Sequence, residues 1–297
     1  MVQTRKLRDL TLAERSCGRP YVEAASGLVR IRDELCVVAD DARDLALFPL
    51  DGHGPGRLVS LLAGDPDSGK PDFEALTTLP PLPGAPHGAL LAVESGSKKD
   101  RHLAVFWALD SGGRLDSERP RAVELAPLYH VLSAEIADLN VEGAAWSGDR
   151  LCLLQRGNGP AGRNAVIELS AAGVAERLAA GDDLDASLVE KISFHYLGEA
   201  SGVPLCFSDA HSLPDGRLVF AAAAEDAEHG DGALTGAVLG VIGASGAIEL
   251  MESMDAPVKA EGVLAWPEDG GRIGLLLVAD ADDPEHPSPL LAATLGA

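Results

Sequence analysis

This sequence of 297 residues is poor in basic charge, in cysteine and in long apolar segments. Its 24 Lys and Arg residues are outnumbered by 46 Asp and Glu residues, which leaves a formal charge of −22. So acidic a chain repels nucleic-acid backbones and anionic membrane surfaces, and we expect neither as a partner. The composition instead favours a small molecule or a cation as the ligand, although solubility alone explains many surface carboxylates.

No apolar run approaches the about 20 residues that cross a bilayer, and residues 1–6 lack the apolar stretch of about 7 to 15 residues that an export signal needs. We therefore expect a cytoplasmic protein. The four cysteines, at positions 17, 36, 152 and 206, do not have the spacing of a zinc site. Cys36 and Cys152 occupy the same place in two apolar segments, so we expect packed free thiols and no disulfide.

What the chain does contain is an internal repeat. The string Glu142-Gly143-Ala144-Ala145-Trp146 recurs as Glu261-Gly262-Val263-Leu264-Ala265-Trp266. In three copies an apolar run begins nine residues after the opening residue, and in two copies a longer loop precedes it. This spacing is typical of a strand, a turn and a returning strand. The opening residues are Ser26, Glu74, Glu142, Asp209 and Glu261.

Each repeat continues with a second pair of short apolar segments, as in residues 45–48 and 58–61. Four short strands per repeat are typical of a propeller blade, and the sequence therefore predicts an all-β, five-bladed β-propeller in one domain, residues 1–297. The last repeat has three strands, and residues 6–12 can supply the fourth and close the ring. The alternative is a six-bladed ring with a degenerate blade within residues 171–205, but residues 171–180 and 184–192 favour short helices.

The opening residues matter because the innermost strands of a propeller line its axis. Four of the five are carboxylic acids, Glu74, Glu142, Asp209 and Glu261, and converging carboxylates repel unless a cation neutralises them. With oxygen ligands and no histidine among them, calcium is the favoured divalent ion, with magnesium and manganese as alternatives. The other possibility is that these acids bind only backbone amides and water.

Further polar residues fall beside the opening positions. The apolar runs are followed by Asp40, Ser95, Arg156, Glu225 and Asp280, and Asn140 and Lys259 precede two opening residues by two positions. We group Ser26, Asp40, Ser95, Asn140, Arg156 and Lys259 as candidate substrate-binding residues. Arg156 either pairs with Glu142 or holds an anionic substrate group, and Lys259 is either an ion-pair partner or a general acid.

The candidate catalytic residues are Glu225, Asp280 and His211. Either acid can serve as general base if it does not bind the metal. His211 follows Asp209 by two residues and is expected to point toward the axis, where it can relay a proton or simply satisfy polar neighbours. A serine nucleophile is not supported, because no Gly-x-Ser-x-Gly motif occurs and Ser26 has no histidine in its repeat.

The repeats resemble a bacterial family of five-bladed propellers over nearly the whole chain. The strings that carry the resemblance are Ala25-Ser26-Gly27-Leu28, Asn140-Val141-Glu142-Gly143, Leu154-Gln155-Arg156-Gly157-Asn158, Leu213-Pro214-Asp215-Gly216-Arg217 and Lys259-Ala260-Glu261-Gly262-Val263. More distantly, the pattern is similar to the esterase-like phytase domain and to gluconolactonase and luciferin-regenerating propellers. That likeness implies a divalent metal on axial acids, and it carries over at Glu142 and Glu261.

These observations lead to two hypotheses. In the first, the protein is a divalent-metal-dependent hydrolase of a small ester, lactone or phosphoester, with Glu74, Glu142, Asp209 and Glu261 as metal ligands. In the second, it is a non-catalytic propeller that binds a ligand or protein partner, and any metal is structural.

Overall fold

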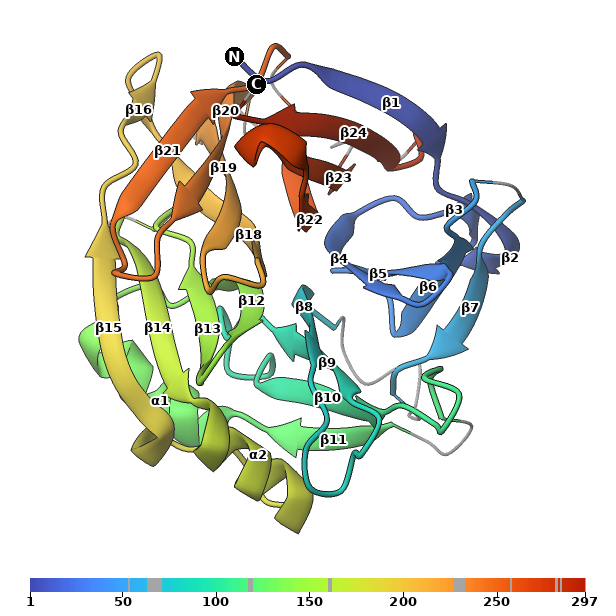
Figure 1. Ribbon diagram of the computed structural model, residues 1–297, viewed down its shortest axis with the longest axis vertical. Coiled ribbons are helices and arrows are strands. Elements are labelled where there is room, and N and C mark those ends of the chain that lie inside the picture. The colour runs from blue at the N-terminus through green and yellow to red at the C-terminus, as the bar shows by residue number, and fades with distance from the viewer. Residues whose placement is uncertain are drawn as a thin grey trace.

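A computed structural model describes residues 1–52, 54–62, 71–116, 120–159, 162–226, 233–256, 258–280, 283 and 285–296. Five four-stranded antiparallel sheets stand around a common axis, as Figure 1 shows. The five-bladed propeller is therefore confirmed, and the six-bladed alternative is not favoured.

Each blade runs from the axis outward through four strands. The inner strands are β4 (Ala25–Ile31), β8 (Phe73–Leu79), β12 (Val141–Ser147), β18 (Cys206–Ser212) and β22 (Ala260–Pro267). The second strands are β5 (Glu34–Ala39), β9 (Ala89–Glu94), β13 (Arg150–Gln155), β19 (Leu218–Asp226) and β23 (Ile273–Ala279). The third strands are β6 (Asp44–Pro49), β10 (Leu103–Ala108), β14 (Asn164–Ser170), β20 (Ala233–Ile242) and β24 (Pro289–Leu295). The outer strands are β7 (Arg57–Ser60), β11 (Arg121–Glu124), β15 (Val189–His195), β21 (Ile248–Ser253) and β1 (Thr4–Asp9).

The fifth blade contains both ends of the chain. Strand β1 pairs antiparallel with β24, with Thr4 opposite Ala293 and Asp9 opposite Pro289. The two termini therefore lie near each other at this blade (Figure 1). The N-terminal segment expected at residues 6–12 is divided here between β1 and β2 (Thr11–Ser16), and β2 pairs with β3 (Arg19–Tyr21) outside the blade.

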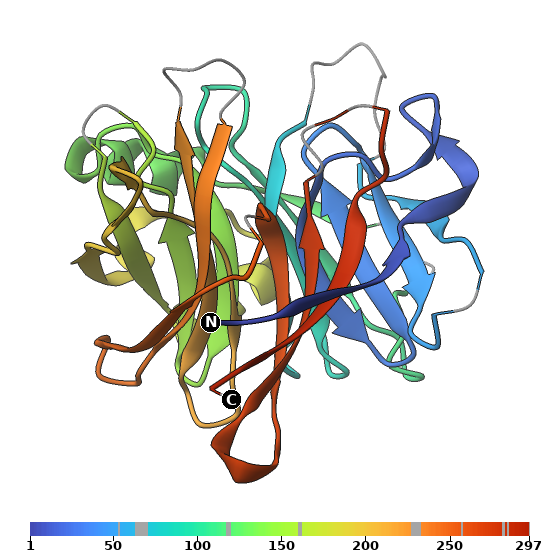
Figure 2. The same cartoon turned by 90° about the horizontal axis from the view of Figure 1, so that it is seen from above.

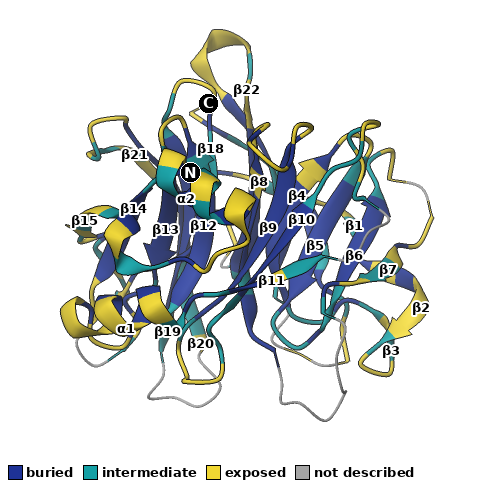
Figure 3. Ribbon diagram, turned by 90° about the horizontal axis from the view of Figure 1, so that it is seen from below, coloured by how far each residue is buried: buried dark blue, intermediate teal, exposed yellow. Residues whose placement is uncertain are grey.

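The apolar runs form strands because each blade is covered on both faces by its neighbours. Five separate clusters of buried side chains fill the five spaces between adjacent blades. One of them joins blade 5 to blade 1 through Leu264 and Leu28. Figure 3 shows the result, with buried strands and with exposed residues concentrated in loops and helices. In addition, Cys36 and Cys152 are buried free thiols, as expected.

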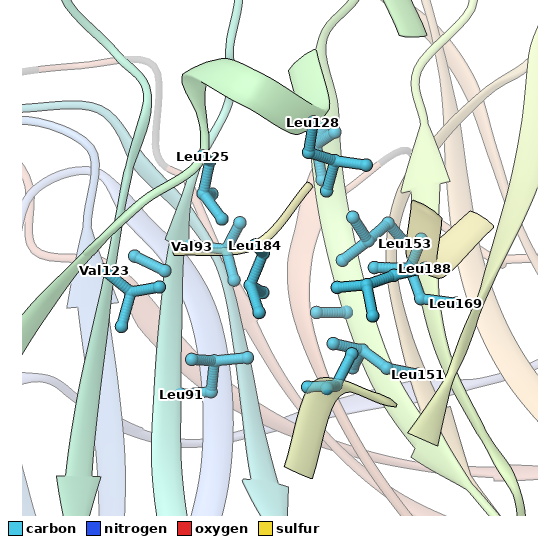
Figure 4. Close-up of a cluster of buried hydrophobic side chains, with 14 of the residues drawn as sticks. Leu91, Val93, Val123, Leu125, Leu128, Leu151, Leu153, Leu169, Leu184 and Leu188 are labelled. Carbon is cyan, nitrogen blue, oxygen red and sulfur yellow. The ribbon is translucent and has the colours of Figure 1, made fainter. Parts of the chain in front are cut away.

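Two helices cover the edge between blades 2 and 3. Helix α1 (Ala126–Glu135) and helix α2 (Ala171–Ala180) turn apolar side chains, such as Leu128 and Val174, into the cluster between these blades. Figure 4 shows part of this cluster. The helix expected at 171–180 is confirmed. The helix expected at 184–192 is wrong, because a short 3-10 helix, η1 (Ala186–Leu188), leads directly into β15.

Small elements complete the chain. Strands β16 (Glu199–Ala200) and β17 (Val203–Pro204) form a short hairpin before blade 4, and the 3-10 helix η3 (Asp269–Gly271) lies in the turn of blade 5. No helix in the described part of the chain has the length and apolar character that a membrane crossing requires.

Candidate functional site

A β-bulge interrupts the inner strand of every blade near its first residue. In β12, Val141 pairs with Gln155 and Gly143 pairs with Leu154, which leaves Glu142 without a position in the ladder. The same interruption singles out Ser26, Glu74, Ser208 and Glu261 in the other four blades. A bulge redirects a side chain and bends its strand, so these five residues are equivalent positions at one end of the axis. We call this region the acidic end.

In the fourth blade the bulged residue is not Asp209, the opening residue that the sequence predicts. Its bulged residue is Ser208, because the hairpin after β18 is one residue longer than the hairpin after β12: Ser212 pairs with Leu218, whereas Trp146 pairs with Leu151. Counting nine residues back from Leu218 therefore identified Asp209, one position too far along the strand.

Asp209 occupies the position held by glycine in three other blades. A Cβ on Gly143 would lie 3.0 Å from the Asp209 Cα, and one on Gly262 would lie 2.8 Å from the Leu28 nitrogen. The neighbouring inner strand thus passes very close to this position. The Asp209 carboxylate meets that strand directly, and its Oδ2 accepts a hydrogen bond of 2.7 Å from the Val263 amide. Its Oδ1 is buried without a hydrogen-bond partner among the described residues.

Two further positions per blade flank the bulge. The amide of the residue after the second strand donates to the carbonyl of the residue two before the bulge, at 2.8 to 3.2 Å in four blades. These pairs are Asp40 with Ala24, Ser95 with Asp72, Arg156 with Asn140, and Asp280 with Lys259. The ladder of blade 4 pairs Cys206 with Ala223 at the same place, and Glu225 lies two residues further along the longer strand β19.

Blades 3, 4 and 5 are joined by a continuous network of opposite charges. Arg156 donates to Glu142 Oε1 at 3.2 Å and to Glu225 Oε1 at 2.6 Å. The Lys259 ammonium lies 3.0 Å from Glu261 Oε1, 3.5 Å from Asp280 Oδ2 and 3.9 Å from Glu225 Oε1. Glu225 therefore joins the two cations. The pairing of Arg156 with Glu142 is the structural alternative that the sequence left open.

Asn140 extends this network at the bulge of blade 3. Its side-chain amide donates to Glu142 Oε1 at 2.6 Å. The other candidate residues with hydroxyl groups bond locally: Ser26 donates to the Ala24 carbonyl at 3.2 Å, and Ser95 donates to Asp72 Oδ2. Ser26 and Ser95 thus orient neighbouring groups in the present arrangement.

Blades 1 and 2 bring three carboxylates together. Asp40, Asp72 and Glu74 each offer an oxygen atom within 4.8 Å of the others, and they are the one such group in the described part of the chain. Arg101 lies 2.7 Å from Asp72 Oδ1. We call Asp40, Asp72 and Glu74 the acid triad.

Asp72 was not identified from the sequence, although a signal was present. It precedes Glu74 by two positions, as Asn140 precedes Glu142 and Lys259 precedes Glu261. The proline-rich loop after β8 and the residues before it obscured the start of this repeat. The same spacing rule applied to blade 2 would have found Asp72.

The pKa values of the buried acids near the bulges are raised. Burial is the main cause for Glu74, and the charges of Glu142, Glu261, Asp72 and Asp40 hold its pKa further above the usual range. Burial also raises the pKa of Glu261, to about 8, against the opposing effect of Lys259. For Asp209, burial raises the pKa, the Val263 and Ala210 amides oppose it, and Glu261 and Glu142 add to it. These acids therefore lie close enough to repel.

Beside the acidic end, blades 3 and 4 enclose a pocket of about 420 Å³. Arg156, Glu225 and Cys206 line it together with the glycine-rich segment after β13. The pocket thus opens next to the ion network and places a cation and a carboxylate on its wall.

His211 belongs to a different region. It lines a pocket at the opposite end of the axis, and the charges that shift the bulged acids do not shift the histidine. Burial lowers the pKa of His211 to about 4, partly offset by a hydrogen bond with the Ser212 backbone. The imidazole is therefore neutral at pH 7, and the structure does not place it beside the carboxylates.

Comparison with models of protein families shows to which family the chain belongs. The model of a family of unknown function (DUF6929) matches residues 21–295. The chain belongs to this family. The comparison with curated proteins found no match.

Among solved structures, the DUF6929 chain is similar to several propellers. A luciferin-regenerating enzyme is 11% identical with a TM-score of 0.44, and the match covers 92% of this chain and 79% of that one. A gluconolactonase from Xanthomonas campestris is 12% identical with a TM-score of 0.43, covering 91% and 71%. A bifunctional GH43-CE protein from Bacteroides eggerthii is 12% identical with a TM-score of 0.48, covering 91% and 33%. At such low sequence identity, these similarities indicate a shared fold and nothing about activity.

Proposed function

We propose that the acidic end is the active site of a divalent-metal-dependent hydrolase that acts on a small ester, lactone or phosphoester. The observation that carries this proposal is the convergence of Asp40, Asp72 and Glu74 within 4.8 Å at the end of the axis. Function here rests on the site and not on the fold, because propellers serve many purposes.

The acid triad has the chemistry of a hard-cation site. Calcium binds carboxylate oxygens at about 2.3–2.6 Å, so oxygens on opposite sides of the ion lie up to about 5 Å apart. The separation within the triad fits this limit. The raised pKa of Glu74 also fits, because a cation would offset the surrounding negative charges. Calcium is the favoured ion, with magnesium and manganese as alternatives. Such an ion supplies a Lewis acid that polarises a carbonyl or phosphoryl oxygen.

The chain's own residues supply the rest of the chemistry. Arg156 lines the pocket between blades 3 and 4 and can hold an anionic oxygen of the substrate. Lys259 lies across the acidic end, where its ammonium can donate a proton or stabilise negative charge. Glu225 and Asp280 are partly exposed, and each carboxylate can take a proton from water as general base.

The predicted ligands Glu142, Asp209 and Glu261 serve in this proposal as charges around the ion. Glu142 and Glu261 already face cations, and Asp209 faces a backbone amide. Glu74 is the residue that the predicted ligand set and the acid triad share.

The test is a hydrolysis screen on purified protein. Lactones, aryl esters and phosphoesters are offered with calcium, magnesium or manganese, and again with a chelator. We expect turnover that needs the metal and that Asp72→Asn abolishes. The matched control is Asp149→Asn, whose side chain is 96% exposed in the turn between β12 and β13, at the other end of β12 from Glu142. Turnover that survives the chelator, or none on any substrate, contradicts the proposal.

The second candidate is a non-catalytic propeller in which the acidic end braces the blades around a ligand or protein partner. The observation in its favour is that Arg156 and Lys259 each already contact two or more carboxylates. Glu142→Gln separates the two. Lost turnover at an unchanged melting temperature favours catalysis, whereas a large fall in melting temperature that no metal reverses favours the structural role.

A further inference from the structure

The opposite end of the axis carries a second pocket, of about 690 Å³. All five inner strands contribute to its wall, through Val29, Thr77, Trp146, His211 and Ala265. Its volume lies within the range of about 300–1,000 Å³ that small-molecule sites occupy. We call it the tryptophan pocket, because Trp146 and Trp266 both line it.

The two indoles come from the same end of the inner strands of blades 3 and 5, one register position apart, and Trp146 also packs against the cluster between blades 2 and 3. Trp266 is 39% exposed and is one of the few large apolar side chains that the fold leaves in contact with solvent. Its ring lies against Gly274 of the next strand, where a Cβ would approach the indole to 2.4 Å. Gly274 thus allows the ring to lie close against the strand. A supported and partly exposed indole presents surface on which a ligand ring can stack.

The polar groups of the pocket carry almost no charge. Thr77 Oγ1 lies 3.3 Å from the Trp146 amide, and the Ser212 hydroxyl donates to the Trp146 carbonyl at 2.6 Å. The charged side chain in the lining, Asp215, is paired with Arg217 at 2.8 Å. His211 is the remaining titratable group, and its low pKa leaves it neutral at pH 7.

We propose that the tryptophan pocket binds an uncharged ring compound that bears hydroxyl groups. The apolar face of the ring stacks on Trp146 or Trp266, and a hydroxyl group bonds to His211. A hydroxyl suits this position because it can both donate and accept, so it complements a neutral imidazole in either tautomer. Monosaccharides and phenols share this chemistry. The acidic end, by contrast, is built for cations and charged groups, so this is a separate site.

The test measures binding and not hydrolysis, so it is independent of the activity proposed above. Full-length protein is titrated with glucose, xylose and phenol, and with glucuronate and benzoate as charged counterparts. Tryptophan fluorescence and calorimetry follow the binding. We expect at least one neutral compound to bind and its charged counterpart to bind more weakly, and the arm that responds distinguishes a sugar from a phenol.

Two variants locate the site. Trp266→Ala should weaken binding about three- to tenfold through lost stacking, and His211→Leu by a similar factor through a lost hydrogen bond. His211→Gln keeps a donor and an acceptor and should restore part of the affinity. The matched control is Trp107→Phe, because Trp107 lies between blades 1 and 2 and its indole donates to the Asp116 carbonyl at 2.9 Å. Glu142→Gln should also leave the affinity unchanged.

Each remaining outcome overturns the proposal. Absence of binding by every neutral compound at millimolar concentration would do so, as would equal binding of the charged counterparts. Affinity that neither Trp266→Ala nor His211→Leu changes would place the ligand elsewhere. Melting temperatures of both variants show that any loss of affinity occurs in folded protein.

Discussion

The two sides of the acidic end, blades 3 to 5 and blades 1 and 2, differ in the partners of their buried carboxylates. On blades 3 to 5, the buried acids Glu142 and Glu261 lie beside Arg156 and Lys259, so the chain provides its own counter-charges. On blades 1 and 2, the three carboxylates of the acid triad lie within 4.8 Å of one another, and Arg101 contacts Asp72. The two sides therefore differ in how their carboxylates are arranged, and under the proposed function the metal would bind at the acid triad.

The largest expected effect comes from removing a built-in cation. Arg156→Met leaves Glu142 and Glu225 without their shared partner, and losing one member of a buried ion pair costs about 3–5 kcal/mol. Urea denaturation measures this loss. It should be the same with calcium and with chelator, because Arg156 does not contact the acid triad. If calcium restored the full free energy of unfolding to Arg156→Met, the division into two sides would be contradicted.

On blades 1 and 2 we expect a substitution of a buried charged residue to raise the free energy of unfolding instead of lowering it. Glu74→Gln removes a carboxylate whose pKa burial and neighbouring acids raise, so in chelator at pH 8 the variant should be more stable than the wild type. With saturating calcium, the gain should vanish because the variant has lost a ligand. Glu142→Gln should show no such gain, since Arg156 would lose a negatively charged partner 3.2 Å away. Destabilisation by Glu74→Gln in chelator would contradict this account.

The pH dependence isolates Glu261. Its folded pKa of about 8 exceeds the ordinary value of 4.5, so the native state holds a proton that the unfolded state has released. Stability from this group is present at low pH and is lost as pH rises through 8. Between pH 6.5 and 8 the wild type should lose up to about 1–2 kcal/mol relative to Glu261→Gln. His211 is present in both proteins, so its titration cancels in the difference between them. A wild type that keeps or gains stability relative to Glu261→Gln over this range would contradict the assignment.

The smallest effect is expected for an ion pair outside the acidic end. Arg114 lies 3.5 Å from Asp33, and both side chains are more than half exposed. Arg114→Ala should change the free energy of unfolding by no more than about 0.5 kcal/mol, because solvent screens such pairs. Denaturation in parallel with Arg156→Met gives the comparison. A loss as large as that of Arg156→Met would mean that burial does not distinguish the two pairs.

The fold could be predicted because the same pattern of apolar segments recurs in several repeats. Leu151–Leu154 and the equivalent runs mark strands that are covered on both faces, and the lag from Glu142 to Leu151 gives the hairpin. The helix at 171–180 followed from its apolar spacing. Residues 189–192 were misassigned to a helix because the side chains of this outer strand are exposed or only partly buried and carry little pattern.

The site could be predicted in part. Glu142 and Glu261 follow from the Glu-Gly repeat, and Arg156 and Lys259 from their places beside it. Asp209 was aligned one residue off because hairpin length, which the lag does not reveal, differs in blade 4. Asp40 and Asp72 meet only when blade 1 packs against blade 2, so their association depends on tertiary structure. His211 lines the pocket at the opposite end of the axis, which strand alternation could not predict because it gives a side and not a depth.

Calorimetric titration of chelator-treated protein with calcium tests the central claim most directly. The account predicts one binding event per chain, lost in Asp72→Asn and retained in Glu142→Gln. Absence of binding by calcium, magnesium and manganese would contradict it. So would binding that Asp72→Asn leaves intact, because the ion would then lie outside the acid triad.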